Sequence, residues 1–215
     1  MRFLVITFTL LFTSACAYNT PVDVSPAYNV YSNYEDKLPG RYALYVDATE
    51  TKGEGDVKGL GCAAHSYPYD GEAAFAASVT ATFRNIVEEV EVVSVPMDAS
   101  ALMAGGYQAQ LTVEVVSMEV DLRVNPGFFS ATIEADTEIA ATVRAVNKAG
   151  NLLGSTIEGT ADAEADAGGF CEGATTAMQE SIGEAIEETM QRLGERLANA
   201  RRLREAAVEV GLGQS

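Results

Sequence analysis

Three cysteines and a single histidine are the residues of this chain that are most suited to bond formation or metal binding. Cys62 and His65 have a spacing that zinc ligands commonly show, and Cys171 with Glu172 could complete such a site. Cys62 and Cys171 each come just before an expected helix, so both could also meet at one edge of the fold and form a disulfide. If the protein is exported, the disulfide is the more economical prediction, because the compartment outside the cytoplasm is oxidising. With Cys16 set aside, Cys62 and Cys171 are the two cysteines that remain to pair. The zinc site is the alternative.

Other groupings typical of catalysis or metal binding are weak or missing in the sequence. It contains no G-x-S-x-G elbow, no phosphate-binding G-x-x-x-x-G-K loop and no H-E-x-x-H motif. His65 is expected to be a loop or capping residue rather than a general base. Asp162, Glu164 and Asp166 alternate like the start of a calcium loop, but its sixth-position glycine and twelfth-position glutamate are missing. We therefore expect alternate acids on a strand, no metal, no cofactor and no enzymatic activity.

The charge of the chain limits its partners. It carries 31 acidic against 14 basic residues, a formal net charge of -17. Such a surface repels phosphate backbones and anionic lipid headgroups, so we expect no nucleic acid partner. Hydrophobic residues make up 47% of the sequence, which is enough for one buried core of ordinary size.

The first fifteen residues predict an export signal. Arg2 is followed by an apolar run over residues 3–12, which is shorter than the roughly 20 residues that cross a membrane. Cleavage before Cys16 would make this cysteine the first residue of the mature protein. A cut near Ala15 or Ala17 would instead leave a soluble periplasmic protein, which is the alternative.

These residues resemble the bacterial lipoprotein signal. Ser14, Ala15 and Cys16 match its pattern, whereas Thr13 stands where leucine is usual. The resemblance implies that Cys16 is lipidated and anchors the protein to a membrane. Ala17, in place of aspartate, resembles the sorting signal for the outer membrane, which implies an anchored protein that faces the periplasm.

The chain divides into four expected parts. Residues 1–15 are the signal peptide, 16–40 the lipidated amino terminus and a flexible tether, 41–205 one domain, and 206–215 a tail. The tether contains prolines among Asn, Ser and Tyr and shows no sustained apolar period.

Alternating apolar residues predict strands near 42–46, 90–95, 108–124, 131–145 and 153–165. A glycine-rich loop is expected over 51–71. Apolar residues at steps of three and four from Phe75 to Val90 predict one face of a helix. Within 108–124 the apolar phase changes at Val115 and Val116. This change predicts a β-bulge. Side chains alternate along a strand, so the apolar residues before and after the change can face the core together only if one extra residue is inserted there.

A long helix is predicted from about residue 173 to residue 205. At 1.5 Å per residue it would be roughly 50 Å long, so its last turns should project beyond the domain. Its second half carries the basic cluster Arg192, Arg196, Arg201, Arg202 and Arg204. Basic residues near a helix carboxyl end are favoured by the helix dipole. The cluster is therefore either a solvated helix end or a docking site for an acidic partner.

The order strand, helix, four strands, helix predicts an α+β two-layer sandwich, with about five mostly antiparallel strands and both helices on one face. In its anchor, tether, element order and length, the chain resembles small envelope lipoproteins of the YajG and LptE types and auxiliary lipoproteins of transport systems. That resemblance implies a non-enzymatic accessory or scaffold role beside an envelope protein partner. The small inward residues Ala161, Ala163 and Ala165 leave binding of a lipid or small solute as the alternative.

Overall fold

The computed structural model describes residues 18–19, 21–25, 36–58, 62, 65–128, 130–169 and 171–212. The expected signal peptide, Cys16 and most of the predicted tether lie outside these residues. The described strands are β1 (Tyr18–Asn19), β2 (Leu38–Asp47), β3 (Lys52–Lys58), β4 (His65–Asp70), β5 (Val87–Val92), β6 (Ala109–Pro126), β7 (Ala131–Asn147) and β8 (Gly150–Asp166). The described helices are the short 3-10 turn η1 (Thr49–Thr51), α1 (Glu72–Ile86), α2 (Ala99–Ala104), α3 (Gly173–Ala198) and α4 (Arg201–Leu212).

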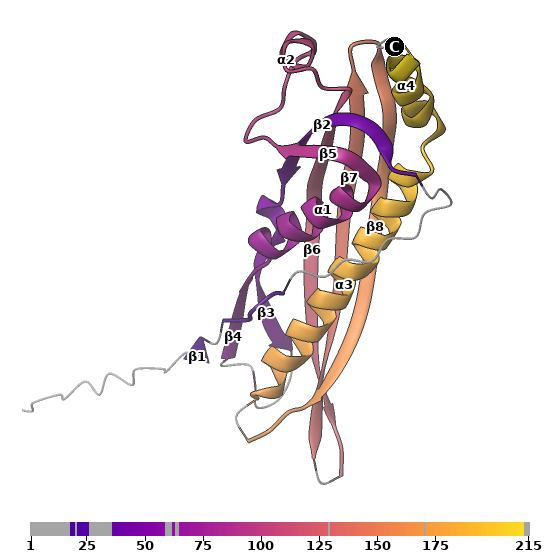
Figure 1. The fold of residues 1–215 in the computed structure, drawn as a ribbon. Helices are drawn as coiled ribbons and strands as arrows, with labels where there is room; N and C mark the ends of the chain where they lie inside the picture. Colours follow the sequence, from indigo (N-terminus) through magenta and orange to yellow (C-terminus); the bar gives the residue numbers. More distant parts are fainter. Residues whose placement is uncertain are drawn as a thin grey trace, which may run out of the picture.

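The described strands form one mixed sheet built around β6. On one side β6 pairs with β7 and β7 with β8, and both of these long ladders are antiparallel. On its other side β6 pairs in parallel with β2 near its start and with β3 near its end, so the sheet forks into two branches. Helices α1 and α3 cover one face of the sheet and contact each other (Figure 1). The predicted α+β two-layer sandwich is confirmed.

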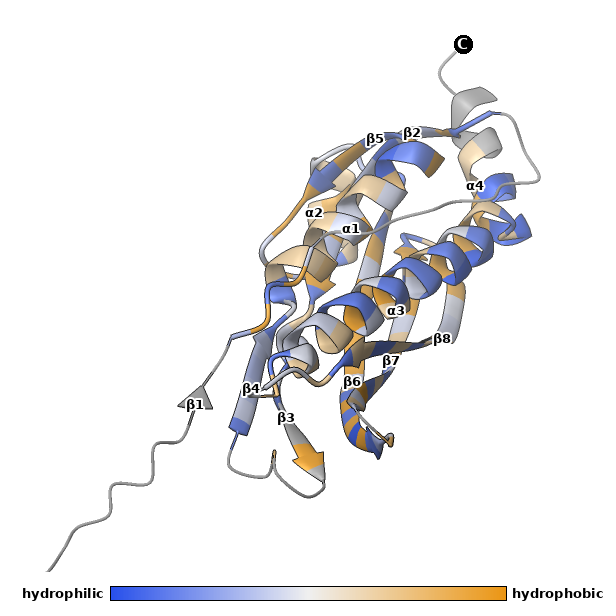
Figure 2. Ribbon diagram, turned by 90° about the horizontal axis from the view of Figure 1, so that it is seen from below, coloured by the Kyte–Doolittle hydropathy of each residue, from blue (hydrophilic) through white to orange (hydrophobic). Residues whose placement is uncertain are grey.

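The core lies between this face of the sheet and the two helices. The predicted apolar stripe of α3 is fully buried and consists of Met178, Ile182, Ile186, Met190, Leu193 and Leu197. Phe75, Val79 and Phe83 of α1 are also fully buried. Figure 2 shows hydrophobic and hydrophilic residues alternating along β6. This is the pattern of a strand with one face on the core and the other in solvent.

The predicted bulge in β6 is confirmed. Val115 is opposite Ala141 of β7 and Ser117 is opposite the next residue, Ala140, so Val116 has no partner in the ladder. Val116 is 55% exposed, whereas Val115 is buried. The extra residue therefore keeps the apolar side chains on both sides of it directed into the core.

Within the range 51–71, predicted as a glycine-rich loop, residues 52–58 and 65–70 form a strand pair, β3 and β4. Two glycines of β3 lie in close contact with side chains of neighbouring elements. A β-carbon at Gly53 would collide with the hydroxyl of Tyr69, and one at Gly55 would lie 2.8 Å from the terminal carbon of Met178. Because these strands lack apolar alternation, their sequence gave no strand signal, and contacts with β6 and α3 decide their conformation.

Two boundaries near α1 also differ from the prediction. The helix ends at Ile86 and β5 begins at the next residue, so Val90 lies in a strand and not on the helix face. The short helix α2 was not predicted. Its start is capped by Asp98, whose carboxylate accepts a hydrogen bond from the amide of Ala101 at 2.8 Å.

The predicted single helix over 173–205 is wrong, because α3 ends at Ala198 and α4 begins at Arg201, with two residues between them. Asn199 closes α3: its backbone and side-chain nitrogens donate to the carbonyl of Glu195 at 3.1 and 2.8 Å. Arg204 of α4 donates from Nε to the carbonyl of Ala198 at 2.6 Å. These contacts satisfy carbonyl groups that a helix end leaves without partners.

Helix α4 packs back on β2 and β8, so the predicted overhang is also wrong. Leu203 is 1% exposed and Ala207 3% exposed. The apolar stripe contains the reason for the break: four and seven residues after Leu197, a continuous helix would place Arg201 and Arg204 on the buried face. Breaking the helix allows Leu203 to reach the core instead.

Part of the range predicted as a tether also packs on the domain. Strand β1 pairs in parallel with β4, and the amide of Val22 donates to the carbonyl of Pro68 at 3.0 Å. Val22 is only 6% exposed. Strand β2 begins at Leu38, which is fully buried.

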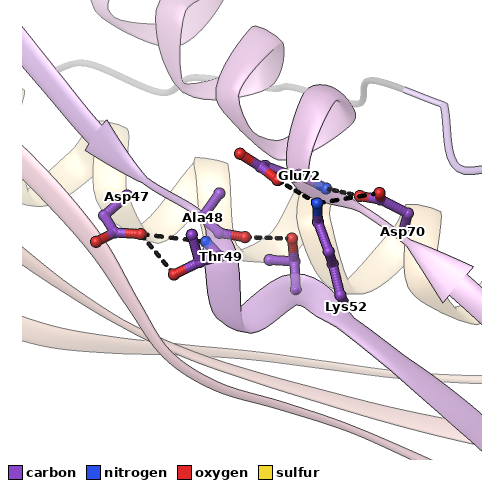
Figure 3. A network of polar contacts seen from close by, with 7 residues as sticks. Asp47, Ala48, Thr49, Lys52, Asp70 and Glu72 are labelled. Carbon is purple, nitrogen blue, oxygen red and sulfur yellow. Dashed lines mark hydrogen bonds and ion pairs between the residues drawn. The ribbon is translucent and has the colours of Figure 1, made fainter. Parts of the chain in front are cut away.

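A polar network fixes the junction of β3, β4 and α1 (Figure 3). The ammonium group of Lys52 lies 3.2 Å from the carboxylate of Asp70 and 2.5 Å from that of Glu72. Asp70 also accepts a hydrogen bond from the amide of Glu72 at 3.1 Å, and this bond is the main reason that the pKa of Asp70 is lowered. Asp47 accepts two further bonds from Thr49. The network orients the start of α1.

Candidate functional site: a groove between β8 and α3

The disulfide prediction is confirmed, since Cys62 and Cys171 are bonded and their Cα atoms lie 5.9 Å apart. Both residues are buried. Cys171 has a φ of 59°, in the left-handed region, and its carbonyl accepts a hydrogen bond from the Tyr67 hydroxyl at 2.9 Å. The zinc alternative is wrong because both sulfurs are used in the bond. His65 lies at the start of β4, and not in a loop as predicted.

The alternating acids Asp162, Glu164 and Asp166 lie in β8, which confirms their prediction as strand residues. Asp162 is opposite Asp136, and Glu164 is opposite Glu134. In the described part of the chain, no group of three or more His, Cys, Asp or Glu residues could hold a metal ion.

Gly159 of β8 allows α3 to approach the sheet closely. A β-carbon at Gly159 would collide with the Thr189 hydroxyl and would lie 2.5 Å from the carbonyl of Ala185. Beside this contact, the buried hydroxyls of Thr137 and Ser181 are 2.7 Å apart. The sheet and α3 are thus in direct contact at Gly159 and at the Thr137–Ser181 pair.

The structure separates the five predicted partner-binding arginines into different roles. Arg204 joins α4 to the end of α3, Arg201 pairs with Glu205 at 3.4 Å, and Arg192 pairs with Glu188 at 2.6 Å. The other two, Arg196 and Arg202, are exposed and make no ion pair with any residue that the structure describes. These two cations are therefore the ones available to a partner.

Arg192 and Arg196 line an open groove of about 600 Å³ between β8 and the second half of α3. The groove is bounded by Thr156, Ile157, Glu158, Arg192, Glu195, Arg196 and Asn199. Sequence analysis identified the arginines but missed the β8 wall. The β8 side of the groove could not be predicted because it depends on how α3 packs on β8, and this packing depends on Gly159.

Glu188 lies on α3 one helical turn before Arg192, which lines this groove. Its carboxylate accepts a hydrogen bond from the amide of Thr160 on β8 at 2.6 Å and also pairs with Arg192. The bond from Thr160 is the main reason, and the charge of Arg192 a further one, that the pKa of Glu188 lies below its ordinary value. A helix side chain thus occupies a hydrogen-bonding position at the strand edge that a neighbouring strand would otherwise take.

Replacing Glu188 with glutamine is expected to lower the free energy of unfolding by roughly 1 kcal/mol at neutral pH, because the acceptor of the Thr160 amide loses its charge and the ion pair with Arg192 is lost. The folded-state pKa is lowered, so the contribution is full above the ordinary glutamate pKa and disappears as pH falls through the lower value. Denaturant unfolding at several pH values between 3 and 7 would measure this. The exposed neighbour Glu187, changed to glutamine, is the control. An equal effect of Glu188→Gln at all pH values would contradict the assignment.

No helix within the described residues combines the length and apolar character that a bilayer span requires.

Fold and groove together define a disulfide-linked α+β sandwich domain. No protein-family model matches the chain, and no curated protein sequence matches it. Among solved structures, it is similar to a Xanthomonas campestris protein of the family DUF330, with 11% identity, 90% of this chain and 99% of that chain covered, and a TM-score of 0.47. A neuraminyllactose-binding hemagglutinin homolog from Helicobacter pylori has 11% identity, coverage of 87% and 99%, and a TM-score of 0.45.

A minor lipoprotein from Acinetobacter baumannii is also similar, with 10% identity, coverage of 79% and 92%, and a TM-score of 0.33. TM-scores below 0.5 at these identities carry no argument about function. None of the three is described as a YajG or LptE type, so that finer resemblance stays a prediction.

Proposed function

We propose that this chain is a bacterial envelope lipoprotein whose single domain is a non-enzymatic accessory or scaffold component of an envelope complex. The observation that carries the proposal is the signal-like amino terminus, which ends in Cys16 and precedes one disulfide-linked domain. A disulfide suits the oxidising compartment to which such a signal leads. Anchoring in the outer membrane follows from the resemblance at Ala17 and is part of the same proposal.

The charge distribution supports a protein partner. The chain has a net charge of -17, yet Arg196 and Arg202 lie exposed near the end of α3 and the start of α4, without an ion pair among the described residues. A local basic surface on an acidic protein favours an acidic partner and disfavours incorrect ones. Its position leaves the core and the disulfide undisturbed when a partner docks.

Changing Cys16 to serine is expected to move the protein from the membrane fraction to the soluble fraction, because the acylated sulfur is lost. Several acyl chains are needed for a lasting anchor, so loss of their attachment site should be nearly complete. Membrane fractionation with mass measurement of the mature amino terminus tests this. Unchanged membrane association of Cys16→Ser would refute lipidation at this residue.

Charge reversal of both Arg196 and Arg202 to glutamate tests the accessory role. Lipidated protein isolated from its own envelope should lose its specific partner, and the native complex should disappear in gel electrophoresis. The fold should persist, because both side chains are exposed. Truncation is less informative, since Leu203 and Ala207 of α4 belong to the core.

The matched control is Arg84→Glu on α1, an exposed arginine that is not part of the groove. If the same complex survives the double reversal, or is lost equally in the Arg84 variant, the proposed role of the basic surface is wrong.

A further inference from the structure

Strand β8 is an edge strand in the described sheet, because β7 is its only partner there. In an antiparallel ladder, the N–H and C=O groups of every second residue point away from the partner strand. Thr160 has this orientation, since its amide bonds to Glu188 of α3 rather than to β7. The register is regular from Thr160 back to Thr156, so Glu158 and Thr156 present their backbone to the same free edge.

Helix α3 covers only part of this edge. At Thr160 the carboxylate of Glu188 takes the position of a neighbouring strand. At Glu158 and Thr156 the groove between β8 and α3 opens, and both residues are exposed. Their amide groups have no acceptor among the residues that the structure describes; the carbonyl of Thr156 accepts a bond from the hydroxyl of Ser155 at 3.2 Å. Two unused backbone donors therefore line the groove.

The charges of the groove select the kind of segment that fits. Arg192 is already paired with Glu188, and Glu195 accepts a bond from Gln191, whereas Arg196 has no ion pair in the described structure. The side chain of Glu158 alternates with the buried Ile157 and so belongs to the outer face of the sheet, away from α3. Arg196 is thus the arginine of the groove that has no ion-pair partner among the described residues.

We propose that this groove binds an extended acidic segment of the protein partner, which adds to β8 as a further strand beside Thr156 and Glu158. Main-chain hydrogen bonds provide the attachment, and Arg196 pairs with an acidic side chain of the segment. The proposal rests on the proposed function and specifies its binding mode. Unprotected strand edges generally favour added strands, and Glu188 protects this one only at Thr160.

The test uses Thr156→Pro in the full chain. Proline removes the outward amide and leaves the ladder with β7 intact, because proline is tolerated where the N–H faces away from the sheet. Thr156→Val, which keeps the amide and a branched side chain, is the matched control. The probe is a display library of random ten-residue peptides selected on the wild-type chain.

Selected peptides should be rich in Asp and Glu, and should bind both Thr156→Pro and Arg196→Glu about tenfold or more weakly. They should bind Thr156→Val and Arg84→Glu as they bind wild type. Hydrogen exchange should slow at Thr156 and Glu158 when a peptide is bound. Absence of selected peptides, selected peptides without acids, or unchanged binding to Thr156→Pro would overturn the proposal.

Two further outcomes separate this inference from the proposed function. If the native complex is lost on charge reversal of Arg196 and Arg202 but survives Thr156→Pro, the accessory role stands and strand addition is wrong. If Thr156→Pro instead dissociates a homo-oligomer of this chain, the occupant is a second copy and the proposed acidic partner is wrong.

Discussion

Replacing both Cys62 and Cys171 with alanine is expected to lower the free energy of unfolding by about 4 kcal/mol. The two cysteines are 109 residues apart, so their bond removes much of the conformational freedom of the unfolded chain. The bond also joins the turn before β4 to the start of α3, where Cys171 has a left-handed backbone. Urea unfolding followed by circular dichroism, with and without reductant, measures the loss.

The variant Tyr67→Phe distinguishes the stability contributed by the disulfide from that contributed by the hydrogen bond beside it. This variant removes only the hydroxyl that bonds to the carbonyl of Cys171, so a loss of about 1 kcal/mol is expected. Reduced wild type should resemble the double-alanine variant. Two free thiols in protein taken directly from the periplasm, or no response to reductant, would contradict the assigned bond.

Gly159→Ala is expected to lower the free energy of unfolding by about 2 to 3 kcal/mol, at the upper end of the usual effect of overpacking. Two of the atoms that the new β-carbon would meet belong to the backbone of α3: the carbonyl of Ala185 at 2.5 Å and the amide of Thr189 at 2.7 Å. A helix backbone cannot rotate away as a side chain can. The helix must therefore move from β8, which also disturbs the bond between Glu188 and Thr160.

Gly183→Ala is the matched control. It is the same chemical change inside α3, but a β-carbon there would meet nothing within 4 Å. Because alanine favours the helix over glycine, this variant should gain up to about 1 kcal/mol. Equal effects of the two changes, measured by thermal and urea unfolding, would show that α3 does not approach β8 as closely as described.

Elements with a strong apolar period could be predicted from the sequence. The stripe from Met178 to Leu197 identified α3, because a helix with one buried face repeats its apolar residues every three or four positions. The phase change at Val115 and Val116 identified the bulge of β6, because a strand has a period of two. Both signals are local and need no knowledge of the neighbouring elements.

Elements decided by distant contacts could not be predicted in the same way. Strand β3 contains glycines where Tyr69 of β4 and Met178 of α3 need room, and glycine lowers local strand propensity. The break at Asn199 has a local signal, because the apolar stripe stops at Leu197 and resumes at Leu203, out of phase with one continuous helix.

The sequence predicted the arginines of the candidate site but not the strand that faces them. The arginines stand out in so acidic a sequence, and Arg196 stays available in the structure. The facing wall at Thr156 and Glu158 gives no signal in composition or motif, since an edge strand and an inner strand have similar sequences. Their exposure depends on which strand ends the sheet.

The pairing of β1 with β4 has a mechanical consequence for a protein held at its amino terminus. A pull from the proposed lipid would first load the short ladder between Tyr18 and His65 and the contact of Val22 with Pro68. The covalent link from Cys62, at the turn before β4, would then carry the force straight into the longest helix. Tension on the anchor would thus enter at β1, β4 and the start of α3, whereas the groove lies beside the other end of that helix, so the module could stay engaged while its membrane attachment moves.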